Sequence, residues 1–312
     1  MVRWLVAGIG DIVAKRVLAA IQAEPRSRLA GFLTRDPAKA ERYGVRAWTD
    51  IHRALAESDA DAVYIATPVF LHAPQTIASI KAGKHVLCEK PMALDYASAG
   101  EMVNAAADAG KLLGVAYYRR LYPKVARARV LMEQGAIGQP VFVEATAHDW
   151  FPSAPGFRSW LADPAMAGGG PLRDVASHRI DLMNYLFGSP GRVCGQLSTM
   201  VQPVAVEDNA TVLVEYEKGV RGMVDARWHS HIPRDEFRIR GTDGELDLTP
   251  LNGAAFVHPG GTEQIPPHAN LHYPCIVNFV DAVLEGAPLV SSGASALAAE
   301  WVMEQVAHTG VR

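Results

Sequence analysis

The stretch that decides the fold lies at the start of the chain, where residues 4–13 read Trp4-Leu5-Val6-Ala7-Gly8-Ile9-Gly10-Asp11-Ile12-Val13. An apolar run that ends in spaced glycines and continues into a helical pattern predicts a strand, a tight turn and a helix. Gly8 permits the tight turn, and Gly10 lets a pyrophosphate approach the helix N-terminus, where free N–H groups favour an anion. We therefore expect the phosphates of a dinucleotide to be bound by Gly8, Ile9, Gly10, Asp11 and Ile12. Val13 stands where the motif usually has a third small residue, so a plain turn without a ligand is the alternative.

The first 118 residues continue this alternation of apolar runs and helical patterns. Strands are predicted at 4–7, 29–33, 62–66, 85–88 and 112–116. Helices are predicted between them at 12–23, 36–43, 50–57, 73–82 and 95–109. Strands that are apolar on both faces and separated by helices indicate a parallel sheet covered on both sides. We therefore expect residues 1–118 to form a Rossmann domain, a doubly wound parallel α/β sheet.

Beyond Arg119 the pattern changes, because strand-like segments follow one another without helices between them. Strands are predicted at 141–147, 193–200, 210–216, 220–228, 236–241 and 245–248, with turn signals at Lys218-Gly219 and Asp243-Gly244. Helices are predicted at 123–133, 172–186, 274–285 and 294–308, and a loop rich in Pro and Gly at 151–171. Residues 119–312 are thus expected to form one α+β domain with a largely antiparallel sheet.

Composition excludes several classes of protein. The chain has 312 residues, of which 49% are hydrophobic, with 30 Lys and Arg against 33 Asp and Glu. This is ordinary globular composition, which excludes a disordered, collagen-like or coiled-coil protein. The length is typical of a protein with two domains. A net charge of −3 without a basic stripe gives no reason to expect nucleic acid as a partner.

The same survey bears on the compartment. No apolar run approaches the ~18 residues of a membrane span, and no signal peptide precedes the first strand. The three cysteines, Cys88, Cys194 and Cys275, are far apart and form no CxxC pair, which fits a reducing environment. We expect a cytoplasmic protein with no membrane partner.

The end of the second strand decides which dinucleotide is favoured. An NAD site normally has Asp or Glu there to bind the ribose 2′-hydroxyl, but this chain reads Leu33-Thr34-Arg35-Asp36. A hydroxyl followed by a guanidinium suits a 2′-phosphate. We expect Thr34 and Arg35 to bind the cofactor, with NADP preferred and NAD the alternative. Asp36 can serve as a displaced ribose ligand, but it is better explained as the N-cap of the helix that Pro37 begins.

Two further motifs carry charged groups. Gly83-Lys84-His85-Val86-Leu87-Cys88-Glu89-Lys90-Pro91 places a Glu-Lys pair at the carboxyl end of a predicted strand, where ligands of open α/β sheets bind. After the glycines at 168–170, the spacing i, i+4, i+7 places Asp174, His178 and Asp181 on one helix face. A histidine beside a carboxylate can act as a general base near neutral pH. The alternative is a plain helix start with His178 as a core histidine.

With Ala66-Thr67-Pro68 and His72 upstream, these motifs resemble the glucose-fructose oxidoreductase / inositol 2-dehydrogenase / rhizopine-catabolism (Gfo/Idh/MocA) family over essentially the whole chain. The resemblance implies a nicotinamide-dependent oxidoreductase that acts on a sugar, polyol or similar hydroxy or keto compound. It also implies a homo-oligomer, dimer or tetramer, built through the exposed face of the antiparallel sheet.

The resemblance also implies residue roles. Lys90 would reach both the substrate hydroxyl and the nicotinamide ribose, with a peptide bond before Pro91 that is often cis. His178 would be the proton donor and acceptor, and Asp174 would orient substrate and histidine. Further cofactor contacts would fall on Thr67, Pro68, His72, Glu89 and Trp160. Further substrate contacts would fall on Tyr118, Arg120 and Arg158.

The chain departs from the family pattern near the expected pocket. Val69 follows Pro68 where Asn is frequent, so the ribose contact made by that Asn is not expected here. Leu161 follows Trp160 where Arg is usual, and Arg158 is a nearby substitute. The entry to the second domain reads Tyr118-Arg119-Arg120 instead of a sequence like Asn-Arg-Arg. For these reasons the reaction class is better supported than any particular substrate.

Other candidate groups are weaker. In His148-Asp149-Trp150 the indole of Trp150 can contact substrate or simply stack at a strand end. His229 and His231 share a strand face, but no acidic or Cys ligand stands at metal spacing, so no metal is expected. A basic run is read as a solvated helix face: Arg119, Arg120, Lys124, Arg127 and Arg129.

We therefore expect an NADP-preferring oxidoreductase in which Lys90 polarises the substrate oxygen and His178 moves the proton. One alternative is an enzyme that holds NAD tightly for redox-assisted elimination or glycosidic cleavage. Another is a non-catalytic sensor of dinucleotide or sugar, although Lys90, Asp174 and His178 form a proton-transfer set that a sensor does not need.

Overall fold

The computed structural model describes residues 1–152 and 158–309 and divides the chain into two compact units. The first unit comprises Met1–Tyr118 and His268–Leu297. The second comprises Arg119–Pro267 and the chain from Ala298 onward. The division at Tyr118 and Arg119 is where the sequence pattern changes, but residues 268–297 pack with the first unit, whereas the sequence analysis places them in the second domain.

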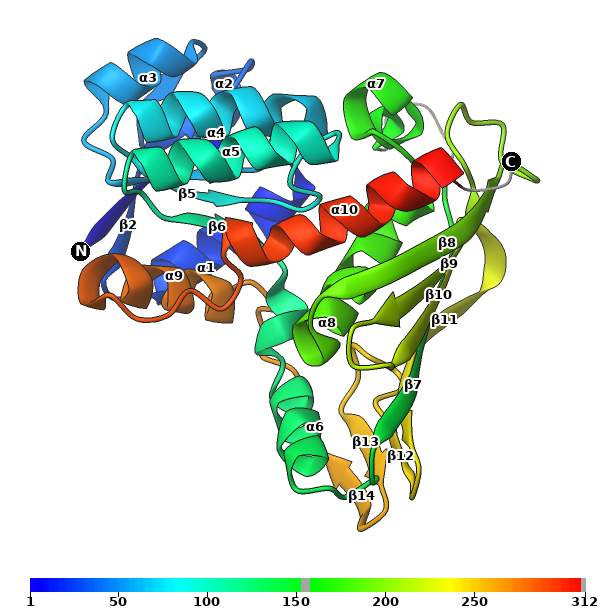
Figure 1. Cartoon of the computed structure of the whole chain (residues 1–312). Coiled ribbons are helices and arrows are strands. Elements are labelled where there is room, and N and C mark those ends of the chain that lie inside the picture. The colour runs from blue at the N-terminus through cyan, green and yellow to red at the C-terminus, as the bar shows by residue number, and fades with distance from the viewer. Residues whose placement is uncertain (153–157, 310–312) are drawn as a thin grey trace. The chain divides into compact units, whose positions relative to one another are not determined.

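A six-stranded parallel sheet forms the centre of the first unit (Figure 1). Its strands are β1 (Val2–Ala7), β2 (Ser27–Leu33), β3 (Ala47–Trp48), β4 (Ala62–Ile65), β5 (His85–Cys88) and β6 (Leu113–Val115). The order is β3-β2-β1-β4-β5-β6, and the described pairs are parallel. This is the strand order of dinucleotide-binding sheets, so the expected doubly wound fold is confirmed.

Helices cover both faces of this sheet (Figure 1). The five that lie between the strands are α1 (Leu18–Ala23), α2 (Ala38–Glu41), α3 (Ile51–Glu57), α4 (His72–Lys81) and α5 (Tyr96–Asp108). A π-helical turn, η1 (Val13–Val17), runs directly into α1, and a short 3₁₀ turn, η2 (Val69–Leu71), precedes α4. Asp50 and Asp95 cap α3 and α5 with their side chains. Asp36 does not cap α2, because Pro37 occupies that position without a side-chain bond, so the predicted cap is wrong.

The late segment belongs to the first unit because α9 (Tyr273–Glu285) completes its core. Trp4 of β1 lies with its ring 5.2 Å from that of Phe279 and 6.3 Å from that of Tyr64. These side chains are fully or almost fully buried, together with apolar residues of η1 and α1. Hydrophobic burial of this kind holds distant parts of a chain in one domain.

The second unit contains an eight-stranded sheet in the order β14-β13-β12-β11-β7-β10-β9-β8. Its strands are β7 (Pro140–Trp150), β8 (Pro190–Ser198), β9 (Asn209–Tyr216), β10 (Arg221–Arg227), β11 (His229–Gly241), β12 (Glu245–Asp247), β13 (Ala255–His258) and β14 (Gly261–Gln264). β7 and β10 run parallel and the other described neighbours antiparallel, which confirms the largely antiparallel prediction. The hairpin of β13 and β14 was not predicted.

Helices pack on one face of the second sheet. They are α6 (Pro123–Glu133), the short α7 (Pro164–Ala167), η5 (Leu172–Ala176) with α8 (Ser177–Phe187), and the part of α10 (Gly293–Thr309) that belongs to this unit. η5 is π-helical and leads without a break into α8. Alternate residues of the central strands are buried under them, among them Val143, Ala145, Val224 and Phe237. Within the described ranges, no helix has the length and apolarity needed to cross a membrane.

Candidate active site

The two glycines after β1 meet different constraints. Gly8 has a φ of +93°, and a Cβ there would lie 2.6 Å from the carbonyl oxygen of Ala66, so only glycine fits. Its N–H donates to the carbonyl of Leu33 at 2.8 Å, which ties the turn to β2. Gly10 is exposed, and a Cβ there would meet open space. The turn therefore leaves room beside Gly10 for a ligand.

A cavity of about 490 Å³ lies beside this turn. It is lined by Ile9, Gly10, Asp11, Ala14, Ala38, Lys39 and Arg42. A concave site of this size, at the carboxyl edge of a parallel sheet and beside a glycine turn, fits the adenosine and phosphate portion of a dinucleotide. Lys39 and Arg42 were not predicted. Their signal in the sequence is the spacing of three residues on the helical turn that follows the second strand.

The segment after β2 adds to this basic character. Arg35 is exposed, and Thr34 is fixed because its Oγ1 accepts from the N–H of Asp36 at 3.2 Å. Among the described residues, no hydrogen bond to the Asp36 carboxylate is present, so this acid is open to solvent beside the cations. Arg42 is held by Tyr43, whose ring centroid lies 4.7 Å from its guanidinium carbon. Three cations, at 35, 39 and 42, therefore follow the second strand.

The loops after β4 and β5 are joined through His72. Its Nδ1 lies 2.9 Å from the carbonyl oxygen of Pro91, and its Nε2 lies 2.9 Å from that of Thr67. Burial lowers the pKa of His72, although hydrogen bonds to these carbonyls oppose the shift. Thr67 and Pro68 are partly exposed, whereas His72 is buried. His72 thus connects the loop after β4 to the loop after β5.

The Glu89-Lys90-Pro91 turn stands at the carboxyl end of β5, as predicted, with a cis peptide bond before Pro91. Lys90 is half-buried. Glu89 is 8% exposed, and its Oε1 accepts from the Tyr64 hydroxyl at 2.7 Å. The same oxygen lies 3.1 Å from Nε2 of His272. No role for Tyr64 or His272 was predicted from the sequence.

The charge of Glu89 follows from its partners. Burial alone would raise the pKa of this carboxyl, but the hydrogen bond and charge of His272, with smaller contributions from Tyr64 and Lys90, lower it. Burial and the neighbouring carboxylate raise the pKa of Tyr64 well above its usual value, so Tyr64 donates its proton. Glu89 is therefore a buried anion next to Lys90.

In the second unit, Asp174 lies in η5 and His178 in the first turn of α8. His178 is 5% exposed. Asp174 Oδ1 pairs with Nη2 of Arg158 at 3.3 Å, so Arg158 brings a guanidinium to this carboxylate. π-Helical turns occur often at functional sites. Asp174 stands on such a turn.

Asp181, on the same helix, has a different partner. Its Oδ2 accepts from Nε of Arg120 at 2.9 Å, and both side chains are almost fully buried. Burial raises the pKa of Asp181, and the adjacent guanidinium offsets this only in part. The structure thus places Arg120, a predicted substrate contact, in a buried ion pair with Asp181.

The start of the Asp174 helix is held by a residue that sequence reasoning missed. Glu207 Oε1 accepts from the N–H of Gly170 at 2.8 Å and from the N–H of Leu172 at 3.1 Å. A Cβ on Gly170 would lie 2.0 Å from the Glu207 carbonyl oxygen, so glycine is required there. Burial raises the pKa of Glu207, although the two N–H groups oppose the shift. No local pattern announces a contact between positions 37 residues apart.

The reading of the basic run as a solvated face is wrong for its first three members. Arg119, Arg120 and Lys124 are 6%, 4% and 1% exposed. Lys124 Nζ donates to the carbonyls of Leu248 at 2.8 Å, Pro250 at 2.7 Å and Ala255 at 3.1 Å. These cations are buried because each finds oxygen acceptors within the second unit.

The two tryptophans predicted as site residues, Trp150 and Trp160, lie in stacked or apolar surroundings. The Trp150 ring stacks on His231 with centroids 3.7 Å apart, at the exposed end of β7. Trp160 packs on a buried cluster that includes Leu161 and Trp228. Leu161 is 4% exposed, so this departure from the family pattern is a core residue here. Part of the loop predicted around it, residues 153–157, lies outside the described residues.

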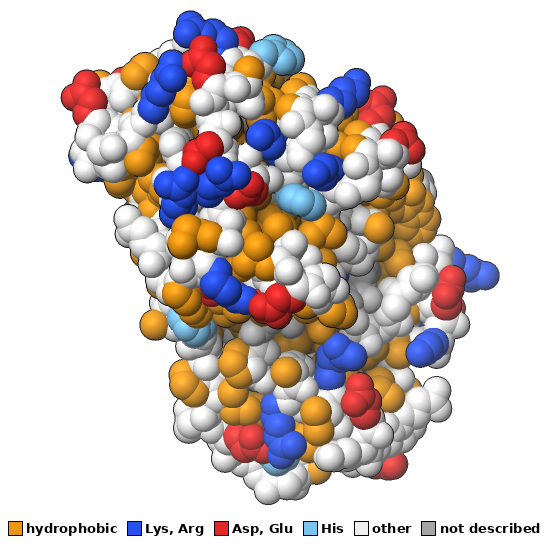
Figure 2. Space-filling model, turned by 90° about the vertical axis from the view of Figure 1, so that its left-hand side faces the viewer, with side chains coloured by type: hydrophobic (Ala, Val, Ile, Leu, Met, Phe, Trp, Pro, Cys, Tyr) orange, Lys and Arg blue, Asp and Glu red, His pale blue; other side chains and the backbone are white. Residues whose placement is uncertain are grey.

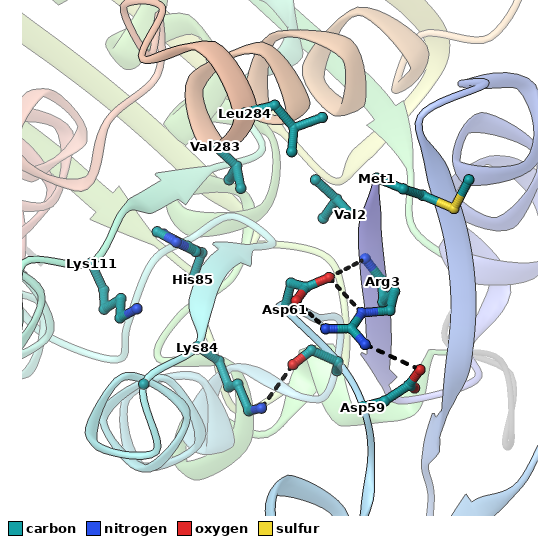
Figure 3. A pocket seen from close by; sticks show the side chains of 12 residues that line it. Met1, Val2, Arg3, Asp59, Asp61, Lys84, His85, Lys111, Val283 and Leu284 are labelled. Atoms are coloured by element: carbon teal, nitrogen blue, oxygen red, sulfur yellow. Dashed lines mark hydrogen bonds and ion pairs between the residues drawn. The ribbon is translucent and has the colours of Figure 1, made fainter.

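A second cavity lies at the opposite edge of the first sheet (Figure 3). Its volume is about 370 Å³, and it is formed at the amino ends of β1, β4 and β5. Arg3 donates to Asp61 at 2.8 Å, and Lys84 donates to the carbonyl of Ala60 at 2.8 Å, so these charges are already paired (Figure 3). Ligands of open α/β sheets bind at the carboxyl edge, which favours the cavity beside Gly10.

Within residues 1–152 and 158–309, no three His, Cys, Asp or Glu side chains cluster so that they could hold a metal ion. His148, a neighbour of the tryptophan, pairs with Asp225 at 2.9 Å. On the face shown in Figure 2, basic and acidic side chains are interspersed, and no broad basic patch forms there.

Comparisons with known proteins agree with this geometry. Residues 2–117 match the model of an oxidoreductase family with an NAD-binding Rossmann fold, and residues 125–247 match the GFO/IDH/MocA C-terminal domain. A 1,5-anhydro-D-fructose reductase of Ensifer adhaerens is 30% identical over 296 residues, 91% of this chain and 88% of the relative. A D-xylose 1-dehydrogenase (NADP(+)) of Haloferax volcanii is 30% identical over 253 residues, 78% of this chain and 75% of the relative.

The structure is also similar to solved structures of this family. The structure of a levoglucosan dehydrogenase in complex with NADH superposes with a TM-score of 0.88 at 25% identity, covering 99% of this chain and 96% of that one. The two family models together span most of both units. The chain therefore belongs to the Gfo/Idh/MocA family and is a nicotinamide-dependent oxidoreductase.

Proposed function

We propose that the protein transfers a hydride between NADP(H) or NAD(H) and a CH–OH carbon of a sugar, polyol or related small molecule. The observation that carries this proposal is the Glu89-Lys90-Pro91 turn. It presents a half-buried lysine at the carboxyl edge of a dinucleotide-binding sheet, where the ligands of such sheets bind. Relatives named for anhydrofructose, levoglucosan and xylose support the substrate class.

The chain's own residues supply position and charge. A nicotinamide cofactor, when bound, would supply or accept the hydride. Lys90 polarises the substrate oxygen and lowers the pKa of the alcohol. His178 moves the hydroxyl proton, and Asp174, braced by Arg158, orients the histidine and the substrate. Gly8 and Gly10 seat the pyrophosphate.

Turnover on a panel tests this reaction class. The panel contains 1,5-anhydro-D-fructose, levoglucosan, D-xylose and simple polyols, each with NADPH, NADP, NADH or NAD, and nicotinamide absorbance is followed. The proposal expects stoichiometric cofactor conversion with at least one compound. Product formation without net cofactor consumption would instead indicate redox-assisted elimination, and dinucleotide binding without turnover across the panel would indicate a sensor.

We further propose that NADP is preferred over NAD, with Thr34, Arg35, Lys39 and Arg42 around the 2′-phosphate. A cationic pocket pairs well with a phosphate, although Asp36 opposes it. NADPH should bind about tenfold or more tightly than NADH, and R35A/R42A should abolish that ratio. D36N should raise the ratio, because it removes a negative charge. Equal dissociation constants in the wild-type protein would contradict the preference.

A homo-oligomer through the outer face of the second sheet is also proposed. That face carries paired charges, such as Arg240 with Glu144 at 2.7 Å and Arg238 with Asp247 at 3.0 Å, beside the exposed Leu213. Light scattering should give a dimer or tetramer, which L213R should dissociate. We also propose a cytoplasmic location, in keeping with three free cysteines, which cell fractionation can test.

A further inference from the structure

Glu89 is held from two sides by residues distant in the sequence. Its backbone N–H donates to the carbonyl of Ile65 at 2.8 Å, which continues the β4–β5 pairing by one residue. Its carboxylate binds Tyr64 of β4 at 2.7 Å and His272 at 3.1 Å through the same oxygen. Main chain and side chain are thus both fixed at the residue that precedes Lys90.

His272 is itself fixed by its surroundings. It is 1% exposed and stands directly before α9. Its backbone N–H donates to Oδ1 of Asn270 at 3.0 Å, and its ring lies 4.8 Å from the ring of Tyr118. Asn270 in turn donates through Nδ2 to the carbonyl of Arg16, in the η1 turn, at 2.8 Å.

The short segment 270–272 therefore contacts three parts of the first unit that carry the expected chemistry. These parts are the helix behind the glycine turn, the Glu-Lys-Pro turn, and Tyr118, an expected substrate contact. A buried carboxylate loses much of its stabilisation if a charged or hydrogen-bonding partner is removed. Without His272, Oε1 of Glu89 would lose one of the two side chains that it binds, and the carboxylate could rotate.

We propose that His272 is a positioning residue of the enzyme. It holds Glu89 in place and thereby fixes the orientation of the Lys90 side chain. This inference rests on the proposed role of Lys90. His272 lies 183 positions from Glu89 and outside the motifs quoted from the sequence. A displacement of about 1 Å in a catalytic group can cost on the order of a hundredfold in rate.

The test compares H272F, H272Q and H268F. Phenylalanine keeps the ring volume but removes the donor, whereas the glutamine amide can donate to Glu89 as Nε2 does. His268 is the matched control, because it lies four residues earlier, stacks on Tyr273, and its Nδ1 contacts the backbone of Asn270 and not Glu89. We expect H272F to lower kcat about tenfold or more, with H272Q and H268F within about threefold of wild type.

A second measurement does not depend on activity. Reductive methylation of the cofactor-free protein, followed by peptide mass spectrometry, gives the labelling rate of Lys90 relative to the exposed Lys218. H272F should change this ratio about threefold or more, because the environment of the amine changes. H272Q and H268F should leave it unchanged. Urea unfolding of all variants checks that each is folded.

A double-mutant cycle separates the two proposals. If Lys90 carries the effect, H272F should cost no more than about twofold in kcat when added to K90A. An H272F enzyme with wild-type kcat and an unchanged labelling ratio, beside an inactive K90A, would overturn the role of His272 and leave the proposed function standing. Full activity in K90A would overturn the role of Lys90 itself, and the labelling ratio would still decide whether His272 holds the turn.

Discussion

Gly8 and Gly10 lie two residues apart, but glycine is needed at these positions for different reasons. Gly8 is required by the fold, since its φ is +93° and a Cβ would strike the Ala66 carbonyl. Gly10 has open space beside it, and that space is the cavity assigned to the dinucleotide. A methyl group at position 10 should therefore affect ligand binding without affecting folding.

Gly10→Ala should leave the protein folded and weaken NADPH binding about tenfold or more, because the methyl group occupies the path of the pyrophosphate. Titration of nicotinamide fluorescence gives the dissociation constant, and urea unfolding gives the stability. Gly100→Ala in α5, where a Cβ also meets open space, is the matched control: it should leave NADPH affinity unchanged and raise stability by about 1 kcal/mol, because alanine favours a helix interior more than glycine does. Unchanged NADPH affinity in the Gly10 variant would count against the cavity as the cofactor site.

Arg158 offers a second test at the scale of single residues. Its guanidinium lies 3.3 Å from Asp174, and it is exposed enough to be replaced without loss of core packing. Arg158→Met should lower kcat/KM about tenfold, because Asp174 loses a charge-assisted partner, while the NADPH dissociation constant stays the same. Arg129→Met, which removes the bond to Tyr185 at 2.7 Å on the same unit, should have no effect on either quantity. Equal kinetics for both variants would remove Arg158 from the site.

At the scale of elements, the helix of Asp174 and His178 depends on Glu207. The carboxylate caps the first N–H groups of η5, and the carbonyl of the same residue leaves space only for glycine at position 170. Burial raises the pKa of Glu207 above its usual 4.5. Folding therefore favours the protonated form of this group relative to the unfolded chain.

The sign of the pH dependence follows from that shift. The contribution of Glu207 to the free energy of unfolding is fully present below pH 4.5 and is lost as the pH rises through the raised folded pKa. Glu207→Gln keeps an acceptor but cannot ionise, so its stability should not fall over that range. Urea unfolding from pH 4 to 8 measures both proteins. Parallel pH profiles for wild type and variant would show that Glu207 ionises as freely in the folded protein as in the unfolded one.

The sequence predicted long, strongly patterned elements well and short ones poorly. The bounds of α6 agree with prediction, since Pro123 marks the start and the apolar pattern the end. β3 has two residues, and β13 and β14 have four each, which is too short for a periodic pattern to stand out. Such strands are stabilised by their neighbours in the sheet and not by local propensity.

Some residues of the candidate site could be predicted from the sequence and others could not. Groups next to a strand end or glycine turn, such as Gly8 and Lys90, could be predicted because local chain geometry places them. His272 and Glu207 could not, because they reach their partners across 183 and 37 residues and no spacing rule connects them. The burial of Arg120 and Lys124 escaped prediction for the same reason, since their acceptors lie on other elements.

At the scale of the whole molecule, the residues of the proposed reaction are divided between the two units. Lys90 and the cofactor turn belong to the first unit, and Asp174 and His178 belong to the second. Residues of the same unit hold these groups in place. His72 and Glu89 fix the loops of the first unit, and Glu207 caps the helix of Asp174 in the second. In the proposed function, Lys90 polarises the substrate oxygen and His178 moves the hydroxyl proton, so both are required for hydride transfer.

Single-turnover hydride transfer tests that claim most directly. NADPH oxidation by excess enzyme with a panel substrate is followed by stopped flow for wild type, K90A and H178A, with K84A and H148A as controls whose side chains bond elsewhere. We predict that K90A and H178A each lose about 10²-fold or more in rate while NADPH still binds, and that both controls remain near wild type. Hydride transfer at the wild-type rate in both K90A and H178A would contradict the account.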